Sequence, residues 1–533
     1  MADGQAAGAD GKSKGRKDPT RTFIMAGLAL GMLLASLDQT VVGTGLPKIV
    51  ADLGGLDKFS WLFSAYMLAA TVMIPMAGKM SDRYGRRPVF LFGMACFLGG
   101  SMLSGIAQDM NQLIIFRFVQ GFGGGAMMPV AMATVADLYP PTERGKIQGG
   151  LGAVFAISSI IGPFIGGYIV DNLNWRWVFY VNLPVGIAAI LVTMVKFPRI
   201  ETNNAKPIDY LGMAAITASL TAGLLITFWG GDMYAWDSVE IIGLGAACVA
   251  ASIGFIVAET KAVDPIVPFH LFKNPIYTLC SLAMLLMAVG LFGVVAFLPL
   301  FLQAVIGISA TYSGEVLIPL MISAMVGSVV SGVLLKRTGY KVWIVSGPMI
   351  GATGLYMLST LHSGSSTSTT VSYLLVTGLG LGFTMANYIV AAQNIIDRKV
   401  MGTATSTLTL FRSLGGTIGI TVLGVVVNRR MAIELPRNLP PGAIDSLPST
   451  DMSTLGNLLL GPGAGSLPAS TIDGIRNALG ESITYVFFIS TAIVLAAWAV
   501  TLFIKSVPLK DRDEYMGNGS TSDAPQKPPV KTE

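Results

Sequence analysis

The sequence LALGMLLASLDQTVVGTGLP, residues 28–47, decides the fold class of this chain. Its side chains are apolar, small or polar without charge, with one acid, Asp38, among them. Arg21 marks the polar edge of the segment, and Asp38 lies about 25 Å beyond it along a helix that rises 1.5 Å per residue. The hydrocarbon core of a bilayer is about 30 Å thick. The stretch therefore predicts a membrane helix that carries a carboxylate in the far half of the bilayer.

A carboxylate at this depth costs at least a few kcal/mol unless it is paired, hydrated or protonated. We interpret Asp38 as an acid that faces an internal cavity and takes up a proton. Two other interpretations stay open: the side chain reaches toward the far interface near Pro47, or a buried cation neutralises it.

Composition supports a membrane protein throughout. The chain has 533 residues, of which 52% are hydrophobic and 12% charged, and its mean hydropathy is +0.65, whereas about a quarter of the residues in a soluble domain are charged. We expect disordered cytoplasmic tails at 1–21 and 506–533. The net charge of +5 is scattered over short loops, which argues against nucleic-acid binding. The three cysteines lie in apolar runs at unrelated spacings, so neither disulfides nor a metal site is expected.

Fourteen apolar segments are long enough to span a bilayer. The positive-inside rule places both termini in the cytoplasm, and the long loop 428–480 is then extracellular, with a short surface helix at 470–479 that does not span. The predicted spans are 22–46, 60–80, 88–107, 113–138, 147–170, 178–197, 209–229, 239–258, 277–303, 312–335, 342–361, 371–392, 403–427 and 481–505.

The chain repeats itself weakly. GKMSDRYGRR at 78–87 resembles GVLLKRTGYK at 332–341, and VQGFGGGAMM at 119–128 resembles VTGLGLGFTM at 376–385. Two six-helix halves related in this way, with a site between them, are typical of secondary transporters. The predicted divisions are a six-helix half at 22–197, two inserted helices with a cytoplasmic linker at 198–276, and a second six-helix half at 277–505.

Five motifs in order resemble the fourteen-helix drug:proton antiporter family of the major facilitator superfamily, over roughly residues 20–506. They are LDQTVVGTGLP (37–47), GKMSDRYGRR (78–87), IIFRFVQGFGGG (114–125), GPFIGG (162–167) and WRWVFYVNLPVG (175–186). Gly43 departs from the family, which usually has Asn there. The resemblance implies the major facilitator fold and a plasma-membrane antiporter that exports lipophilic, cationic compounds in exchange for protons. We expect a monomer without a cofactor.

Residues 78–87 join the second and third predicted spans. Gly78 lets a neighbouring helix approach, Gly85 permits a tight turn, and Asp82 can accept from a helix N-terminus or pair with a basic residue. The resemblance implies a cytoplasmic latch between the halves; the basic residues would also serve as a topology signal alone. The latch set is Gly78, Asp82, Arg83, Gly85, Arg86 and Arg87. Lys336 replaces Asp82 in the second copy.

The segment GPFIGG combines a predicted helix break at Pro163 with small positions that favour close packing. Its residues Gly162, Pro163, Gly166 and Gly167 resemble the motif that accompanies antiport, and ordinary packing by glycine is the plainer interpretation.

Three further charges lie in predicted spans. Arg117 is a proton-relay residue by resemblance, or an arginine that reaches the outer interface. Glu315 is a second proton site, a counter-ion for a cationic substrate, or a hydrated interfacial acid. Arg412 is left open between packing and a substrate-facing role. We therefore name Asp38, Arg117 and Glu315 as candidates for proton coupling.

Uncharged polar side chains in the spans either orient a ligand or bond across helices. The predicted substrate cavity contains Asp38, Gln39, Tyr66, Gln303, Glu315, Asn387 and Asn394.

Enzymatic patterns fail on inspection. AAGADGKS at 6–13 lacks the first glycine of a phosphate-binding loop and the flanking strand and helix, and His270 and His362 both fall in predicted loops. Without nucleotide-hydrolysis motifs, the energy source must be an ion gradient. The alternatives are a carrier of a specific metabolite, lipid or peptide with the same fold, a membrane receptor, and, least favoured, an intramembrane enzyme.

Overall fold

The structure is a computed structural model that describes residues 19–53, 59–197, 209–231, 233–440, 443–444, 447, 452–460 and 468–509. Most of the two predicted tails therefore lies outside the described residues. The described part is helical apart from its connections and one isolated β-bridge between Gly230 and Tyr234. This confirms the predicted all-α membrane fold.

The helices follow the order of the predicted spans and are generally longer than predicted. They are α1 (Pro19–Leu53), α2 (Phe59–Tyr84), α3 (Arg86–Ile106), α4 (Met110–Leu138), α5 (Pro141–Asn172), α6 (Trp177–Tyr180), α7 (Asn182–Lys196), α8 (Tyr210–Trp229), α9 (Val239–Lys261), α10 (Pro275–Leu300), α11 (Ala310–Thr338), α12 (Tyr340–Ser359), α13 (Thr367–Asn394), α14 (Met401–Asn438), α15 (Met452–Leu460) and α16 (Ala469–Leu502). Short turns of 3₁₀-helix occupy Phe269–Lys273 and Arg398–Val400, and a π-helical turn at Phe301–Ile306 extends α10.

Local sequence explains where many helices begin. A polar side chain accepts a hydrogen bond from the first turn at Asp109 before α4, Asp209 before α8, Ser238 before α9, Ser309 before α11 and Ser366 before α13. Such caps satisfy backbone N–H groups that have no partner inside the helix. The apolar spans are thereby bounded by residues close to them in sequence.

Within the described residues, thirteen helices are long and apolar enough to cross a membrane. The helix α5 is not among them, but its 32 residues extend about 48 Å at 1.5 Å per residue, and it packs along both α1 and α11. With α5 the count is consistent with the predicted fourteen.

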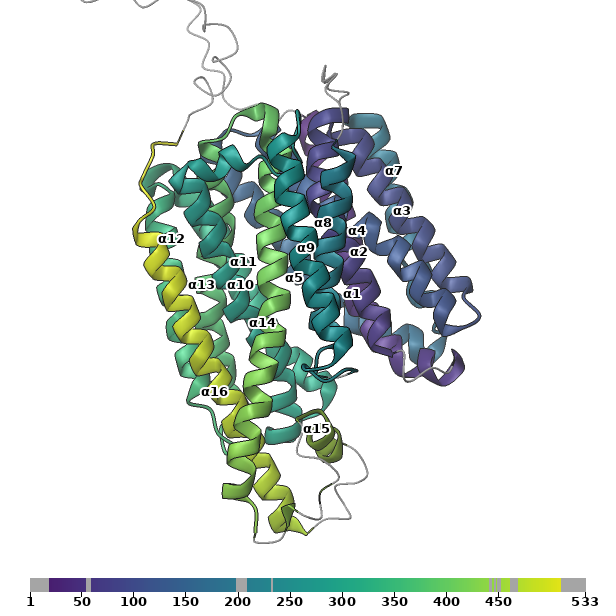
Figure 1. Cartoon of the computed structure of the whole chain (residues 1–533), viewed down its shortest axis with the longest axis vertical. Helices are drawn as coiled ribbons and strands as arrows, with labels where there is room; N and C mark the ends of the chain where they lie inside the picture. Colours follow the sequence, from purple (N-terminus) through teal and green to yellow (C-terminus); the bar gives the residue numbers. More distant parts are fainter. Residues whose placement is uncertain are drawn as a thin grey trace, which may run out of the picture.

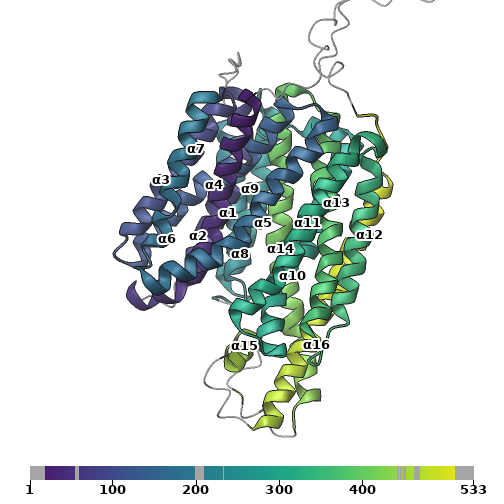
Figure 2. The same cartoon turned by 180° about the vertical axis from the view of Figure 1, so that it is seen from behind.

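Two predictions about the C-terminal region are wrong. Residues 470–479 do not form a separate surface helix, because α16 begins at Ala469 and continues to Leu502 without interruption. The helix α14 also continues well past residue 427, to Asn438. As a result α14 and α16 project beyond the other helices, near α15 (Figures 1 and 2).

The helices form two bundles, α1–α7 and α10–α16, with α8 and α9 beside them (Figure 1). One buried apolar cluster fills the second bundle, and two fill the first, one of which also includes residues of α8. The helix α1 begins, and α16 ends, at the same end of the molecule. We call this the proximal end, and the end near α15 the distal end.

The two bundles meet toward the proximal end. The helices α5 and α11 touch through their backbones, since a Cβ on Gly332 would lie 2.4 Å from the carbonyl carbon of Gly145. Gln148 of α5 donates to Gln393 of α13 at 3.2 Å. Toward the distal end the ribbons of the bundles diverge (Figure 2). This arrangement is closed at one end, as one state of a rocking transporter requires.

Candidate functional site

A buried ion pair joins α1 to α4. Asp38 and Arg117 both have no exposed surface, and Arg117 Nη1 donates to Asp38 Oδ2 at 2.5 Å. The other carboxylate oxygen accepts from Gln120 Nε2 at 2.8 Å and from Asn182 Nδ2 at 2.9 Å. Three donors from α4 and α7 therefore stabilise the charged form of the carboxylate.

The guanidinium of Arg117 has its own surroundings. It lies over the ring of Tyr66, 4.5 Å from the centroid, and Nη1 also donates to Gln120 Oε1 at 2.9 Å. Its Nε and Nη2 have no hydrogen-bond partner among the described residues. Arg117 is thus a buried partner of Asp38, and the alternative in which it reaches the outer interface is wrong.

Glycines in α4 create the space for this pair. A Cβ on Gly121 would lie 2.4 Å from the backbone oxygen of Tyr66, and one on Gly124 would lie 2.3 Å from its hydroxyl. On α3, a Cβ at Gly100 would lie 2.5 Å from the backbone nitrogen of Gln120. The run GFGGG is therefore a packing surface that brings α2 and α3 against α4 beside the ion pair.

Sequence reasoning missed two side chains that bind Asp38. Gln120 lies one turn after Arg117 on the same helix, so its spacing was an available signal. Asn182 begins α7 and also donates to Ser101 Oγ at 3.0 Å, while Ser101 donates to the backbone oxygen of Phe179 at 2.8 Å. Only the tertiary structure shows that this chain of hydrogen bonds ends at the carboxylate.

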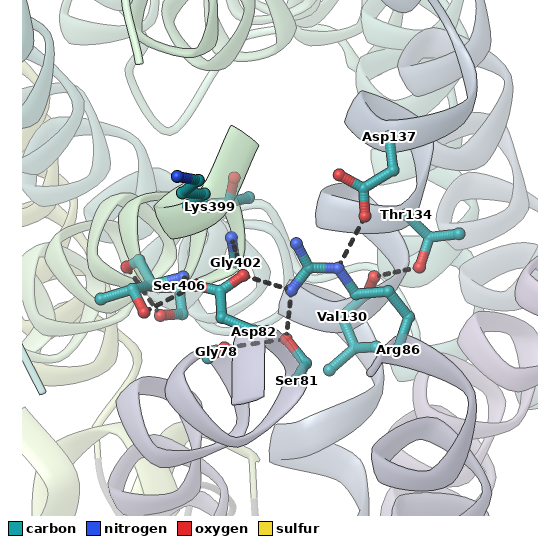
Figure 3. Close-up of polar contacts among 12 residues, drawn as sticks. Gly78, Ser81, Asp82, Arg86, Val130, Thr134, Asp137, Lys399, Gly402 and Ser406 are labelled. Atoms are coloured by element: carbon teal, nitrogen blue, oxygen red, sulfur yellow. Dashed lines mark hydrogen bonds and ion pairs between the residues drawn. The ribbon is translucent and has the colours of Figure 1, made fainter. Parts of the chain in front are cut away.

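A second site joins the two bundles at the proximal end (Figure 3). The carboxylate of Asp82, near the end of α2, accepts from the backbone N–H groups of Gly402 at 2.8 Å and Thr403 at 2.6 Å. It also accepts from Thr403 Oγ1 at 2.7 Å. These donors form the first turn of α14, where the helix dipole favours a negative charge.

Arg86 supports Asp82 from the side of α3. Its Nη1 lies 2.6 Å from Asp82 Oδ1 and donates to Ser81 Oγ at 2.6 Å. Its Nε donates to Asp137 Oδ2 at 2.8 Å, and this bond connects the network to the end of α4. Arg86 is buried, so this network holds Asp82 in place from within the first bundle, opposite the start of α14 (Figure 3).

The other residues of the predicted latch divide into two groups. Gly78 lies where α2 crosses α14, because a Cβ there would lie only 2.0 Å from Ser406 Oγ, and Gly85 adopts a φ of 91° between α2 and α3. The two remaining arginines point elsewhere: the guanidinium of Arg83 lies over the ring of Tyr84, and Arg87 Nη2 donates to the backbone oxygen of Met194 on α7.

The GPFIGG segment packs α5 against α1 next to the ion pair. A Cβ on Gly162 would lie 1.9 Å from Oγ1 of Thr40, two residues after Asp38. Gly166 is buried and Gly167 partly so, and a Cβ on Gly167 would meet open space. The side chain of Pro163 lies outside the described residues. The predicted helix break is absent, since α5 is continuous from Pro141 to Asn172.

Of the predicted substrate-cavity residues, Asp38 and Tyr66 meet at Arg117 in the first bundle, whereas the described contacts of the polar residues in the second half lie elsewhere. Tyr66 is 2% exposed and bonds to half-buried Gln39, and Gln303 donates to Ser313 on α11. Asn387 is fully buried and donates within its own helix. Glu315 is exposed in the first turns of α11 and makes no hydrogen bond or ion pair with the described residues.

Asn394 is a correction to the predicted cavity. It is the last residue of α13, lies at the proximal end and donates to the backbone oxygen of Pro508 at 3.1 Å. It therefore anchors the segment after α16 and does not line the space between the bundles. A polar residue in an apolar span indicated that Asn394 makes an interaction. The sequence did not show that α13 ends at this residue, at the proximal end of the molecule.

Comparisons with known proteins match this architecture over most of the chain. The sequence profile of the Major Facilitator Superfamily matches residues 28–420. The multidrug transporter protein MdtP of Bacillus subtilis is 38% identical over 519 residues, covering 94% of this chain and 96% of the relative. The tetracenomycin C resistance and export protein of Streptomyces glaucescens is 30% identical over 526 residues, with 96% of each chain covered.

Among solved structures, that of the proton:xylose symporter XylE shares the fold. It superposes with a TM-score of 0.62 and 12% sequence identity, covering 94% of this chain and 100% of that one. At this identity the likeness concerns the fold alone. The sequence profile, the relatives and the two-bundle architecture agree: the chain belongs to the major facilitator superfamily, a family of membrane transporters.

Proposed function

We propose that the protein is a multidrug efflux antiporter that exports lipophilic compounds in exchange for protons by alternating access. Relatives named for multidrug transport, multidrug resistance, and tetracenomycin C resistance and export support drug efflux. We place it in the plasma membrane as a monomer with cytoplasmic termini. The proximal end is then cytoplasmic and the distal end is extracellular.

The observation that carries the proposal is the buried pair of Asp38 and Arg117. Removing one charge of such a buried ion pair costs about 3–5 kcal/mol, because the other charge is left buried without a partner. Protonation of Asp38 does what a mutation would do, but reversibly. It removes the negative charge from Arg117 and from the amide donors of Gln120 and Asn182.

Coupling then follows from a shared conformational equilibrium. The state described here is closed at the proximal end by Asp82 and α14 and diverges at the distal end, where an external proton would enter. Protonation of Asp38 and substrate binding favour different states, so each lowers the affinity for the other without direct contact. Export in exchange for protons is the result.

The preferred charge of the substrate depends on the acids that remain free. Asp38 is already neutralised by Arg117 and has no exposed surface. Glu315 is exposed and is therefore the candidate counter-charge for lipophilic cations. We propose that Glu315→Gln weakens transport of cationic compounds and leaves transport of neutral compounds intact.

Transport into proteoliposomes with an imposed pH gradient tests the proposal. Wild-type protein should accumulate a lipophilic dye only when the gradient is present, and collapse of the gradient by a protonophore should stop it. Asp38→Asn is the matched variant, since it keeps the size and much of the hydrogen bonding of Asp but cannot change charge. Gradient-driven transport by Asp38→Asn at the wild-type rate would exclude Asp38 as the coupling site.

A further inference from the structure

A second arginine lies deep in the protein, and the proposed coupling pair does not use it. Arg412 follows Met401, the first residue of α14, by about three turns, which places it about 17 Å from the start of that helix. This depth is near the middle of a hydrocarbon core about 30 Å thick. The side chain is only partly buried in the structure.

Arg412 has no acidic partner among the described residues. Its one polar contact there is a hydrogen bond from Nη2 to the sulfur of Met128, at 2.9 Å. A thioether is a weak acceptor, and a guanidinium has five N–H donors. Arg117 provides an internal comparison, since the same residue type in the same protein is paired with a carboxylate.

Arg412 lies at the interface between the two bundles. Met128 belongs to α4 of the first bundle, and Arg412 to α14 of the second. The next residue, Ser413, forms a hydrogen bond with Thr71 of α2 at 3.1 Å. Met128 lies about 16 Å along α4 from Arg117, toward the proximal end. Arg412 is therefore on the proximal side of the Asp38 pair.

The charges inside the spans do not balance around this residue. Asp38 and Arg117 neutralise each other, and Glu315 lies in the first turns of α11, near the distal end. Among the residues that the structure describes, Arg412 thus keeps a positive charge without an acidic partner, and such a charge inside a membrane span is costly. A planar guanidinium with free donors is suited to bind a carboxylate or a similar anion through two parallel hydrogen bonds.

We propose that Arg412 binds the acidic group of a lipophilic organic anion, so that the protein exports amphipathic carboxylates as well as uncharged compounds. This inference rests on the proposed function, because it assumes that substrates pass between the two bundles. The sequence resemblance implied lipophilic, cationic substrates, for which Glu315 is the proposed counter-charge; the positive charge of Arg412 adds carboxylates to this range.

The test compares two probes that differ in one charge. A fluorescent aryl carboxylate and its methyl ester are titrated against purified protein in lipid nanodiscs, and binding is followed by fluorescence anisotropy. Wild-type protein should bind the carboxylate at least tenfold more tightly than the ester. Arg412→Gln should weaken binding of the carboxylate by about ten- to a hundredfold, the effect of one hydrogen bond to a charged group, and change binding of the ester less than about twofold.

Two further variants separate recognition from packing. Arg412→Lys keeps the charge but loses the planar fork, so it should weaken carboxylate binding severalfold and leave the ester unaffected. Met128→Leu removes the sulfur acceptor and keeps an apolar side chain of similar size, so the preference for the carboxylate should persist. If Arg412→Gln does not purify as a folded protein, Arg412→Lys decides: unchanged carboxylate binding overturns the proposal.

Equal binding of the two probes by the wild type, or an unchanged preference in Arg412→Gln, also overturns it. A third outcome also overturns the proposal: Arg412→Gln and Met128→Leu both lose thermal stability, and both variants bind the two probes equally less well. Arg412 would then serve packing. The proposed function is tested separately by gradient-driven transport of the ester. Transport of the ester with no carboxylate preference would refute only this inference, whereas carboxylate binding without gradient-driven transport of either probe would refute the proposed function.

Discussion

Asp82→Asn is the sharpest test of the contact between α2 and α14. Asn keeps the volume and one acceptor oxygen of Asp but loses the charge, and three hydrogen bonds from the first turn of α14 end at this carboxylate. A hydrogen bond to a charged group contributes about 1.5–3 kcal/mol, against about 0.5–1.5 kcal/mol for a neutral pair. The side chain is only 7% exposed, so solvent screens this difference little.

The loss is therefore about 1 kcal/mol for each of the three bonds, with about 0.5 kcal/mol more from the helix dipole. A total of about 3–4 kcal/mol changes the ratio of closed to open proximal ends by about a hundred- to a thousandfold. Folding should be affected less, because Asp82 lies near the end of α2 and, in the proposed mechanism, its bonds to α14 break whenever the proximal end opens.

Distances between spin labels measure this equilibrium directly. Cysteines at Tyr84 and Lys399 are suitable label sites, because both side chains are exposed on either side of the contact. Double electron–electron resonance should show longer distances in Asp82→Asn than in the wild type. Thr403→Val is the graded control, since it removes one of the three bonds and should shift the ratio by about tenfold. Wild-type distances together with wild-type transport in Asp82→Asn would refute the reasoning.

Four further outcomes are expected. Asp38→Asn should abolish gradient-driven efflux and also the proton release that a pH dye detects when substrate binds. Asp38→Glu should keep part of both activities. Proton release that persists in Asp38→Asn but is lost in Glu315→Gln would assign the coupling to Glu315. Asn182→Leu removes one donor from the Asp38 carboxylate and one from Ser101 Oγ, so gradient-driven efflux should fall by about tenfold; efflux at the wild-type rate would mean that this donor is unimportant. Gly78→Val should lower transport without loss of membrane insertion, because its side chain would occupy the space of Ser406 Oγ; full activity would show that α2 and α14 do not need this close approach. A cysteine at Pro440 should react with an impermeant maleimide from outside intact cells, and reaction only after permeabilisation would reverse the proposed orientation.

The sequence by itself determined the helices of this protein. Apolar runs of about twenty residues require helical backbone in a bilayer, because every N–H and C=O group must be satisfied within the segment. The start of many helices is also local, as Asp109 shows: its side chain caps α4 by accepting from the N–H three residues later. At residues 470–479 the sequence correctly predicted helical structure. The error was to treat this helix as separate from the last span, with which it is continuous.

Several side chains important to the site were also visible as anomalies of composition. Asp38, Arg117 and Arg412 are charges where charges are costly, and that cost predicts a partner or a function. The sequence did not reveal which partner, because Asp38 and Arg117 are 79 residues apart and the rotation of each helix about its own axis determines whether they meet.

Only the tertiary structure decided how each of these charges is satisfied. It placed Asp82 on the first turn of α14, 320 residues away, added Gln120 and Asn182 to the carboxylate of Asp38, and moved Asn394 out of the expected cavity to the proximal end. It also left Arg412 facing a thioether where Arg117 faces an acid. Both arginines lie within apolar spans. Their partners differ because the packing of helices determines which side chains lie within hydrogen-bond distance, and no single helix contains that information.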